Sequence, residues 1–153
     1  MTLIHRAAIF VFTASLAMGA DLSIGTWKFN PEKSKVRKPE DWKGRITVIA
    51  NGPTADSVIT KTGTTESSGP VFGKEVVVYY NGKEMPGAFP GTSLISTKVN
   101  DREWMQINKR GGKEYGHTKT TLSADSKTRT AEVHSTDAKG AAYDEMRVFD
   151  RVK

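Results

Sequence analysis

Residues 100–151 read NDREWMQINKRGGKEYGHTKTTLSADSKTRTAEVHSTDAKGAAYDEMRVFDR and contain four segments of alternating residues separated by three compact turn signals. The turn signals are Gly111-Gly112, Asp125-Ser126 and the run DAKG at 137–140. Short turns between alternating segments are typical of antiparallel strands joined by tight hairpins. This part of the chain therefore predicts a meander of antiparallel strands.

The turns also predict the register, and hence which side chains share a face. Two-residue turns at 111–112 and 125–126 place Met105 opposite Thr118 and Thr118 opposite Val133. A four-residue loop at 137–140 places Ala131 opposite Met146. A slip of one residue would move every side chain of a strand to the other face.

Followed through all three turns, this register sorts the residues into two faces. One face collects Met105, Ile107, Leu122, Ala131, Val133, Met146 and Val148; the other collects Trp104, Gln106, Tyr115, His117, Lys119, Glu132, His134, Tyr143, Glu145, Arg147 and Phe149. We expect the first face to point inward. The alternative is that the aromatic face lines a polar cavity, and a bulge near Asn100 would reconcile the position of Trp104 with the first interpretation.

The preceding chain continues the same pattern. Alternating or β-branched segments predict strands at 24–29, 44–51, 56–62, 74–80 and 92–99. Asn81-Gly82 is a strong hairpin signal, and residues 86–91 form a Pro- and Gly-rich loop that carries Phe89. We predict one all-β domain, a single antiparallel up-and-down β-barrel of about 8–10 strands.

Residues 1–20 have the features of a signal peptide. A short basic start is followed by an apolar run at 7–17 and by small residues suited to cleavage after Gly19 or Ala20. The mature domain then covers residues 21–153, and the chain contains no cysteine for a lipid anchor or a disulfide. We predict a periplasmic or secreted protein without a transmembrane segment, and expect a monomer.

The positive charge is concentrated in one loop. The whole chain has a formal net charge of +6, and residues 33–45 contain six basic residues against Glu40 and Asp41, a local +4. Such a segment suits either a solvated loop or a contact with an anionic polymer or lipid headgroup. Trp42 is the only aromatic residue within it.

Catalytic motifs are absent from the sequence. There is no Gly-x-Ser-x-Gly elbow and no cysteine nucleophile, so we assign no catalytic residue and no cofactor. His117 and His134 fall opposite each other in the predicted register, which makes them candidates for a metal site or for a barrel enzyme. Two imidazoles are fewer than the three protein ligands that zinc sites typically use, so no metal ligand is assigned.

Gly25-Thr26-Trp27 on the first predicted strand resembles the Gly-x-Trp signature of lipocalins and their calycin relatives. The chain is similar to small exported bacterial lipocalin-like barrels that carry Gly-Thr-Trp-Lys near the mature start. The resemblance implies that Trp27 packs at the closed end of the barrel, covered by Arg147 or Arg151. Residues 147–149 (RVF) also resemble the Arg-x-Tyr that holds a ligand carboxylate in fatty-acid-binding proteins, although Phe149 lacks the phenol.

Two departures from these families are evident. No Thr-Asp-Tyr lipocalin motif occurs, and the basic loop is too short for the helical lid of fatty-acid-binding proteins. The expected function is non-catalytic binding of a small, largely apolar ligand inside the barrel. The expected ligand-binding residues are Trp27, Met105, Ile107, Val133, Met146, Val148 and Arg147.

Overall fold

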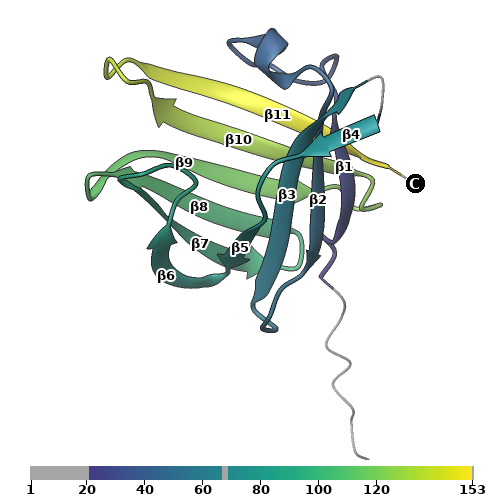
Figure 1. The fold of residues 1–153 in the computed structure, drawn as a ribbon, viewed down its shortest axis with the longest axis horizontal. Helices are drawn as coiled ribbons and strands as arrows, with labels where there is room; N and C mark the ends of the chain where they lie inside the picture. Colours follow the sequence, from purple (N-terminus) through teal and green to yellow (C-terminus); the bar gives the residue numbers. More distant parts are fainter. Residues whose placement is uncertain (1–20, 67–68, 153) are drawn as a thin grey trace, which may run out of the picture.

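The part of the chain that the structure describes forms an antiparallel sheet of eleven strands with a single short helical turn (Figure 1). The computed structural model describes residues 21–66 and 69–152, so the predicted signal peptide at 1–20 lies outside the described residues. The elements are β1 (Gly25–Phe29), the 3-10 helix η1 (Pro39–Trp42), β2 (Arg45–Asn51), β3 (Ser57–Glu66), β4 (Gly69–Phe72), β5 (Val76–Tyr79), β6 (Asn81–Pro86), β7 (Thr92–Asn100), β8 (Glu103–Arg110), β9 (Lys113–Leu122), β10 (Thr128–Thr136) and β11 (Ala142–Val152). The predicted all-β, up-and-down architecture is confirmed.

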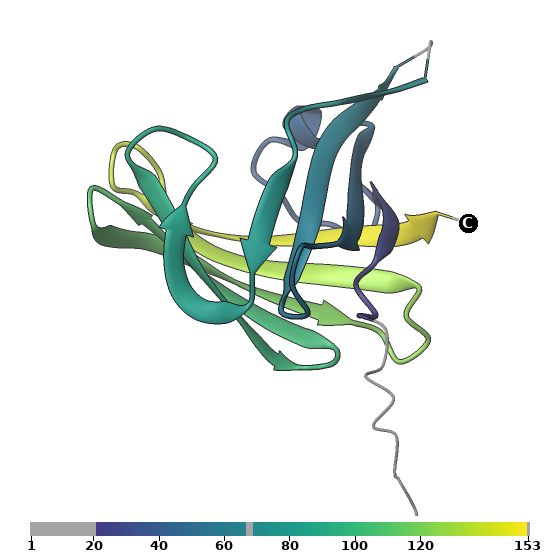
Figure 2. The same cartoon turned by 60° about the horizontal axis from the view of Figure 1, so that its bottom comes forward.

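The sheet curls so that the last strand meets the first. The hydrogen-bonded order is β4-β3-β2-β1-β11-β10-β9-β8-β7-β6, and β5 pairs separately with β3. Figure 2 shows the curl, with β2 and β3 facing the β8–β10 layer across the interior. The ladder does not close: β5 pairs with β3, β6 pairs with β7, and the single residue Tyr80 joins β5 to β6. The prediction of a closed barrel of 8–10 strands is therefore wrong in closure and in strand number.

The Asn81-Gly82 pair does not form the predicted hairpin. The chain runs on from β5 into β6 and turns back only at residues 87–91. Gly82 uses its positive φ of 72° at a register shift between Asn81 and Glu84, where the strand bends away from β3 toward β7. The positive φ of Gly82 is therefore used in a β-bulge here, rather than in a type I′ turn.

The register of the β9–β10 hairpin is as predicted, but its two outer neighbours are each displaced by one residue. Thr118 pairs with Val133 and Thr120 with Ala131. However, Met105 pairs with Lys119 rather than Thr118, and Ala131 pairs with Arg147 rather than Met146. The prediction of one common apolar face is therefore wrong for β8 and β11, whose side chains are inverted relative to β9 and β10.

Both displacements have a local cause. The Gly111-Gly112 turn forms with positive φ at both glycines, but the ladder skips Tyr115 between the pairs Lys109–Glu114 and Asn108–Gly116. The β10–β11 loop has five residues instead of four, because the Asp137 carboxylate accepts the backbone N–H groups of Lys139 and Ala141 at 2.9 and 3.0 Å. The predicted bulge near Asn100 is present, between Lys98 and Asn100.

Consequently the inner face is a mixture of the two predicted sets. Ala131, Thr120 and Arg147 share it with Trp104 and Phe149, which line the cavity described below. Ile107 and Met146, predicted to point inward, lie on the outer rows with His117 and Glu132. Val148 also lies on the outer row, opposite Thr130, and is buried where residues 30–36 run beside β11.

Trp27 and Arg151 fasten the junction between the first and last strands. The two residues are cross-strand partners, Trp27 is fully buried, and the Arg151 guanidinium lies 4.2 Å from the centre of the indole ring. Arg151 donates to the backbone carbonyls of Ile24, Leu22 and Ser126 at 2.6, 2.7 and 2.8 Å. Arg151, not Arg147, covers the tryptophan.

Gly25 completes this arrangement. Its φ is 145°, and a Cβ at this position would collide with the Arg151 guanidinium. The Gly-x-Trp pattern therefore has a direct physical basis, because the glycine leaves room for the arginine that covers the tryptophan two residues later.

Replacing Arg151 with alanine should destabilise the fold strongly. The change removes three charge-assisted hydrogen bonds and the cation–π contact, so we expect a loss of about 2–4 kcal/mol in the free energy of unfolding, measured in urea. Arg151→Lys should recover less than half of this loss, since an ammonium cannot span three carbonyls. Arg110→Ala removes an exposed arginine that contacts only Tyr115 by cation–π, and should cost within about 0.5 kcal/mol. Equal losses for Arg151→Ala and Arg110→Ala would contradict this role.

Candidate functional site

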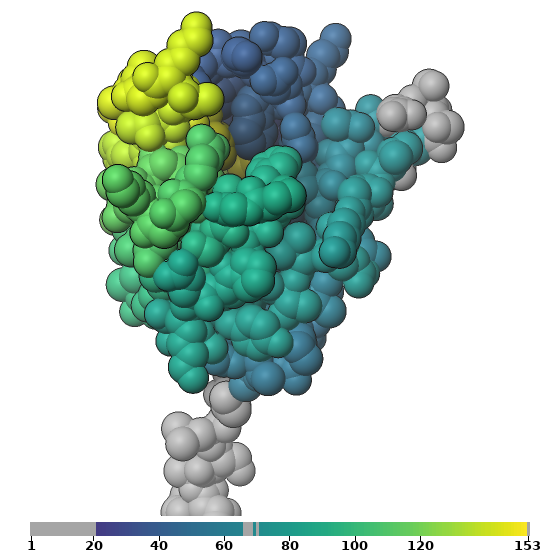
Figure 3. Space-filling model, turned by 60° about the vertical axis from the view of Figure 1, so that its left-hand side comes forward, coloured from purple at the N-terminus to yellow at the C-terminus, as the bar shows by residue number. Residues whose placement is uncertain are grey.

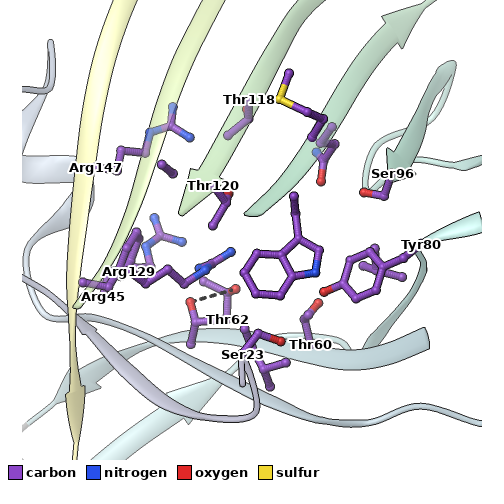
Figure 4. Close-up of a pocket in the computed structure, with 18 of the residues that line it drawn as sticks. Ser23, Arg45, Thr60, Thr62, Tyr80, Ser96, Thr118, Thr120, Arg129 and Arg147 are labelled. Atoms are coloured by element: carbon purple, nitrogen blue, oxygen red, sulfur yellow. Dashed lines mark hydrogen bonds between the residues drawn. The ribbon is translucent and has the colours of Figure 1, made fainter. Parts of the chain in front are cut away.

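A cavity of about 350 Å³ lies between the two layers of the curled sheet (Figure 4). Its walls combine aromatic and aliphatic side chains with many hydroxyls and three arginines. The lining residues are Ser23, Trp42, Arg45, Thr47, Ile49, Thr60, Thr62, Val78, Tyr80, Ser96, Trp104, Met105, Gln106, Thr118, Thr120, Arg129, Ala131, Arg147 and Phe149. Figure 4 shows the three arginines on one side of the cavity and Tyr80 and Ser96 on the other.

Arg129 lines the cavity without an acidic partner among the described residues, as does Arg45. Arg129 lies on β10 between Leu122 and Phe149, and its guanidinium is 5.7 Å from the centre of the Phe149 ring. Burial lowers the pKa of Arg129 below its ordinary value, and no carboxylate within the described residues forms an ion pair with it. Its remaining accessible surface faces the cavity.

The other two arginines are held by the protein. Arg147 donates from Nε and Nη2 to the Glu145 carboxylate at 2.9 and 2.7 Å, and lies 4.4 Å from the Trp42 ring centre. Arg45 donates from Nη2 to the Asp41 carbonyl at 2.8 Å and lies 5.3 Å from the same ring. Arg147 is therefore neutralised locally, whereas Arg129 is not.

Trp42 closes one end of the cavity. It ends η1, and its ring packs 5.5 Å from that of Phe29 and 6.3 Å from that of Phe149. Figure 3 shows the η1 region, in blue, between the β10–β11 tip in yellow and the β3–β4 strands in teal. A residue of the basic loop is thus part of the cavity wall.

Several buried donors at the cavity have no acceptor. Among the described residues, Trp104 Nε1 and Arg45 Nε are buried without a hydrogen-bond partner, as is the Ser23 hydroxyl. An unsatisfied buried polar group costs about 1–3 kcal/mol. Together with the Arg129 guanidinium, these groups make the cavity rich in donors that a bound acceptor would satisfy.

Tyr80 supplies a phenol to this cavity from the junction between β5 and β6. Burial, assisted by the nearby charge of Asp21, raises the pKa of Tyr80 to about 12, while Arg129 and Ser23 act in the opposite direction. The phenol is therefore neutral at physiological pH. It faces a cavity to which Phe149 contributes only an apolar ring.

The predicted ligand-binding residues are only partly brought together. Of the seven, Arg147 lines the cavity from the inner row, and Met105 borders it but lies on the outer row opposite Lys119, contrary to the prediction that it points inward. Trp27 packs in the core beside it, Val133 is buried on the inner face of β10, and Ile107, Met146 and Val148 lie on outer rows.

Sequence reasoning missed Arg129, Tyr80 and Arg45 as cavity residues, and it placed Trp104 at a cavity only in the alternative in which the aromatic face points inward. A signal existed for Arg129, which alternates in phase with Ala131 and Val133 on the face that was predicted to point inward. A charged residue that alternates in phase with buried apolar residues on one strand points to the same side of the sheet, and therefore toward the interior.

The basic loop is largely engaged with the rest of the chain. Lys33 pairs with Asp150 at 3.1 Å, and Arg37 pairs with Asp137 at 3.5 Å. Arg45 turns into the cavity wall. Three of the six basic side chains that suggested a polyanion contact therefore have intramolecular roles, and binding of a polymer by the loop stays a prediction.

These features define an antiparallel β-sheet protein with an internal, donor-rich cavity. No known protein-family profile matches the chain, and no curated protein is similar to it in sequence. Among solved structures, the chain is similar to secretory abundant heat soluble protein 4 from Ramazzottius varieornatus, with a TM-score of 0.53 and 12% identity over 88% of this chain and 97% of that one. This likeness concerns the fold alone. Within the described residues, no helix has the length and hydrophobicity needed to cross a bilayer.

The raised pKa of Tyr80 predicts an alkaline instability. Because the folded state favours the protonated phenol, the stability that it contributes is complete below about pH 10 and is lost as the pH rises from about 10 toward 12. We expect Tyr80→Phe to abolish a decline on the order of 2–3 kcal/mol over this range, measured by urea unfolding at each pH. Identical alkaline slopes in the two proteins would refute the assignment, and ultraviolet titration should show that the variant lacks the highest phenolate step.

Proposed function

We propose that this protein is an exported, non-catalytic binding protein of lipocalin-like type that holds a small amphipathic molecule with an anionic group inside its sheet. The observation that carries the proposal is Arg129, an enclosed guanidinium that faces a cavity and has no carboxylate partner among the described residues. The volume of about 350 Å³ falls within the ~300–1,000 Å³ typical of small-molecule sites.

An anionic group is favoured by the balance of charge and donors. Removing a guanidinium from water is costly unless an opposite charge replaces the lost solvation. Within the described residues Glu145 compensates Arg147, whereas Arg129 and Arg45 have no carboxylate partner; Arg45 donates to the Asp41 carbonyl, so Arg129 is the cavity cation with the most unmet demand for an anion. The unsatisfied Nε1 of Trp104 adds a second donor for the same acceptor-rich group.

An apolar body is favoured by the remaining walls. Trp42, Trp104, Ile49, Val78 and Phe149 offer rings and branched aliphatic groups to the cavity. Burial of apolar ligand surface against such walls contributes about 25 cal/mol per Å² before the costs of association are subtracted. The combination suits a molecule with an apolar body and one acidic end.

Export and the calycin relationship rest on the sequence. The signal-peptide pattern at 1–20 supports a periplasmic or secreted location, and Gly25 and Trp27 with the covering Arg151 support the resemblance to calycins. We assign no catalytic step to the cavity, since a phenol with a pKa of about 12 is a poor general base near neutral pH.

A matched pair of fluorescent probes tests the proposal. 1-Anilinonaphthalene-8-sulfonate is an anion, whereas N-phenyl-1-naphthylamine has the same ring skeleton without the sulfonate. We expect the native protein to bind the anionic probe more tightly than the neutral one. Arg129→Gln should lower the affinity for the anionic probe by roughly 10- to 100-fold, because a charge-assisted hydrogen bond contributes about 1.5–3 kcal/mol. The affinity of this variant for the neutral probe should differ from that of the native protein by less than about threefold.

Two further variants make the result specific. Trp104→Phe keeps an aromatic side chain in the cavity wall but removes the Nε1–H donor. It should therefore lower the affinity for the anionic probe and leave the affinity for the neutral probe unchanged. Arg110→Gln removes an exposed cation outside the cavity and should leave both affinities unchanged. Equal affinity of the native protein for the two probes would exclude an anion site, and failure to bind either would exclude the binding function.

A further inference from the structure

The outer face of the sheet carries a pair of histidines that is independent of the cavity. His117 on β9 and His134 on β10 are direct cross-strand partners, as their predicted register requires. Their side chains are 42% and 52% exposed, and the two ring centres lie 5.1 Å apart with a 40° angle between the ring planes. Both rings are therefore open to a solute ion.

Each imidazole is oriented by a carboxylate on the same ring nitrogen. His134 Nδ1 lies 2.6 Å from Asp144 Oδ1, and His117 Nδ1 lies 3.3 Å from Glu114 Oε1. Metal-binding histidines usually donate one N–H to a carboxylate or carbonyl, which fixes the ring and makes the other nitrogen a better ligand. In both residues the nitrogen left for an ion is Nε2.

The spacing of the rings fits a shared ion. Nitrogen ligands lie about 2.0–2.1 Å from zinc, and a tetrahedral angle at the metal then places the two ring centres roughly 5 Å apart. The observed 5.1 Å matches this geometry. A cross-strand pair also fixes both Cα positions on the ladder, so little rearrangement is needed to bring the rings to one ion.

We propose that His117 and His134 form an outer-face site for a divalent transition-metal ion, zinc or copper, bound through both Nε2 atoms. Imidazole nitrogen is a preferred ligand of these ions, and copper binds a given nitrogen site more tightly than zinc. No group of three or more His, Cys, Asp or Glu side chains in a metal-binding arrangement occurs within the described residues. Water therefore fills the remaining positions, and the site is open and exchangeable rather than structural.

Two neighbouring carboxylates have defined roles in this proposal. Asp144 and Glu114 are positioning residues that act through the histidines, and removal of such a partner typically weakens metal binding 10- to 100-fold. Glu132 is paired with Lys119 two positions along the same two strands and provides a matched control. It lies on the same face but contacts neither imidazole nitrogen by a hydrogen bond.

The test is a calorimetric titration of the purified protein with Zn²⁺ and, separately, Cu²⁺ at pH 7.5. We expect one ion per chain, with copper tighter than zinc. His117→Ala and His134→Ala should each weaken binding at least tenfold, and Asp144→Ala about tenfold. Glu132→Gln should change affinity by less than about twofold.

Nuclear magnetic resonance of the imidazole nitrogens adds a second measurement. Their chemical shifts report metal binding directly, and a general loss of stability would not reproduce the expected changes. Zinc should shift Nε2 of both histidines, and Asp144→Ala should alter the tautomer of His134 in the metal-free protein. The proposal is overturned if the native protein binds neither ion below 100 µM. It is equally overturned if the double variant His117→Ala/His134→Ala retains the native affinity, or if Glu132→Gln loses as much as the histidine variants. None of these outcomes depends on whether the cavity binds an anion.

Discussion

The contact between Trp27 and Arg151 is the constraint on which the shape of the molecule depends. It joins the first strand to the last, and Arg151 also reaches the carbonyls of Leu22, Ile24 and Ser126. One side chain thereby ties together the segment before β1, the end of β11 and the β9–β10 turn. The chain has no cysteine, so this junction is held without a disulfide.

The junction also explains how the interior can be partly polar. Trp27 belongs to a buried cluster with Phe29, Ile49, Val58 and Leu122, which supplies apolar burial at one end of the sheet. The same cluster includes Ile49, Trp104 and Phe149, which also line the cavity, where hydroxyls and arginines join them. The apolar core therefore continues into the cavity wall, and its burial offsets the cost of the unsatisfied donors there.

The strands could be predicted from sequence because alternation and turn residues are local signals. The register of β9 on β10 followed correctly from Asp125-Ser126 alone. The inner faces of β8 and β11 could not be predicted, because each depends on one extra residue that alternation and turn type do not show: Tyr115, which the β8–β9 ladder skips, and the fifth residue of the β10–β11 loop. The carbonyl of Tyr115, the residue that the ladder skips, accepts hydroxyl bonds from Ser135 and Thr136 at 3.2 Å, and a Cβ at Gly116 would collide with β10.

The candidate cavity was harder to predict than the fold for the same reason. A single-residue displacement exchanges the whole lining of a strand, so Arg147 and Trp104 entered the interior while Ile107 and Met146 left it. Ala131, which lies on the strand whose register was predicted correctly, is a cavity residue that the sequence placed on the right face. The histidine pair was predictable because it lies on that same hairpin.

At Tyr80, between β5 and β6, the ladder of backbone hydrogen bonds around the curled sheet is interrupted. Every other pair of neighbouring strands along the curl is held by a ladder of backbone hydrogen bonds, whereas within the described residues no ladder pairs β5 with β6, and the packing of Tyr80 against Trp104, with ring centres 6.2 Å apart, supports the join. Separating the sheet here breaks no ladder of backbone hydrogen bonds, so we expect local opening here before opening between paired strands. Tyr80, which joins β5 to β6, also lines the cavity. Opening of the sheet at this point would therefore change the shape of the cavity.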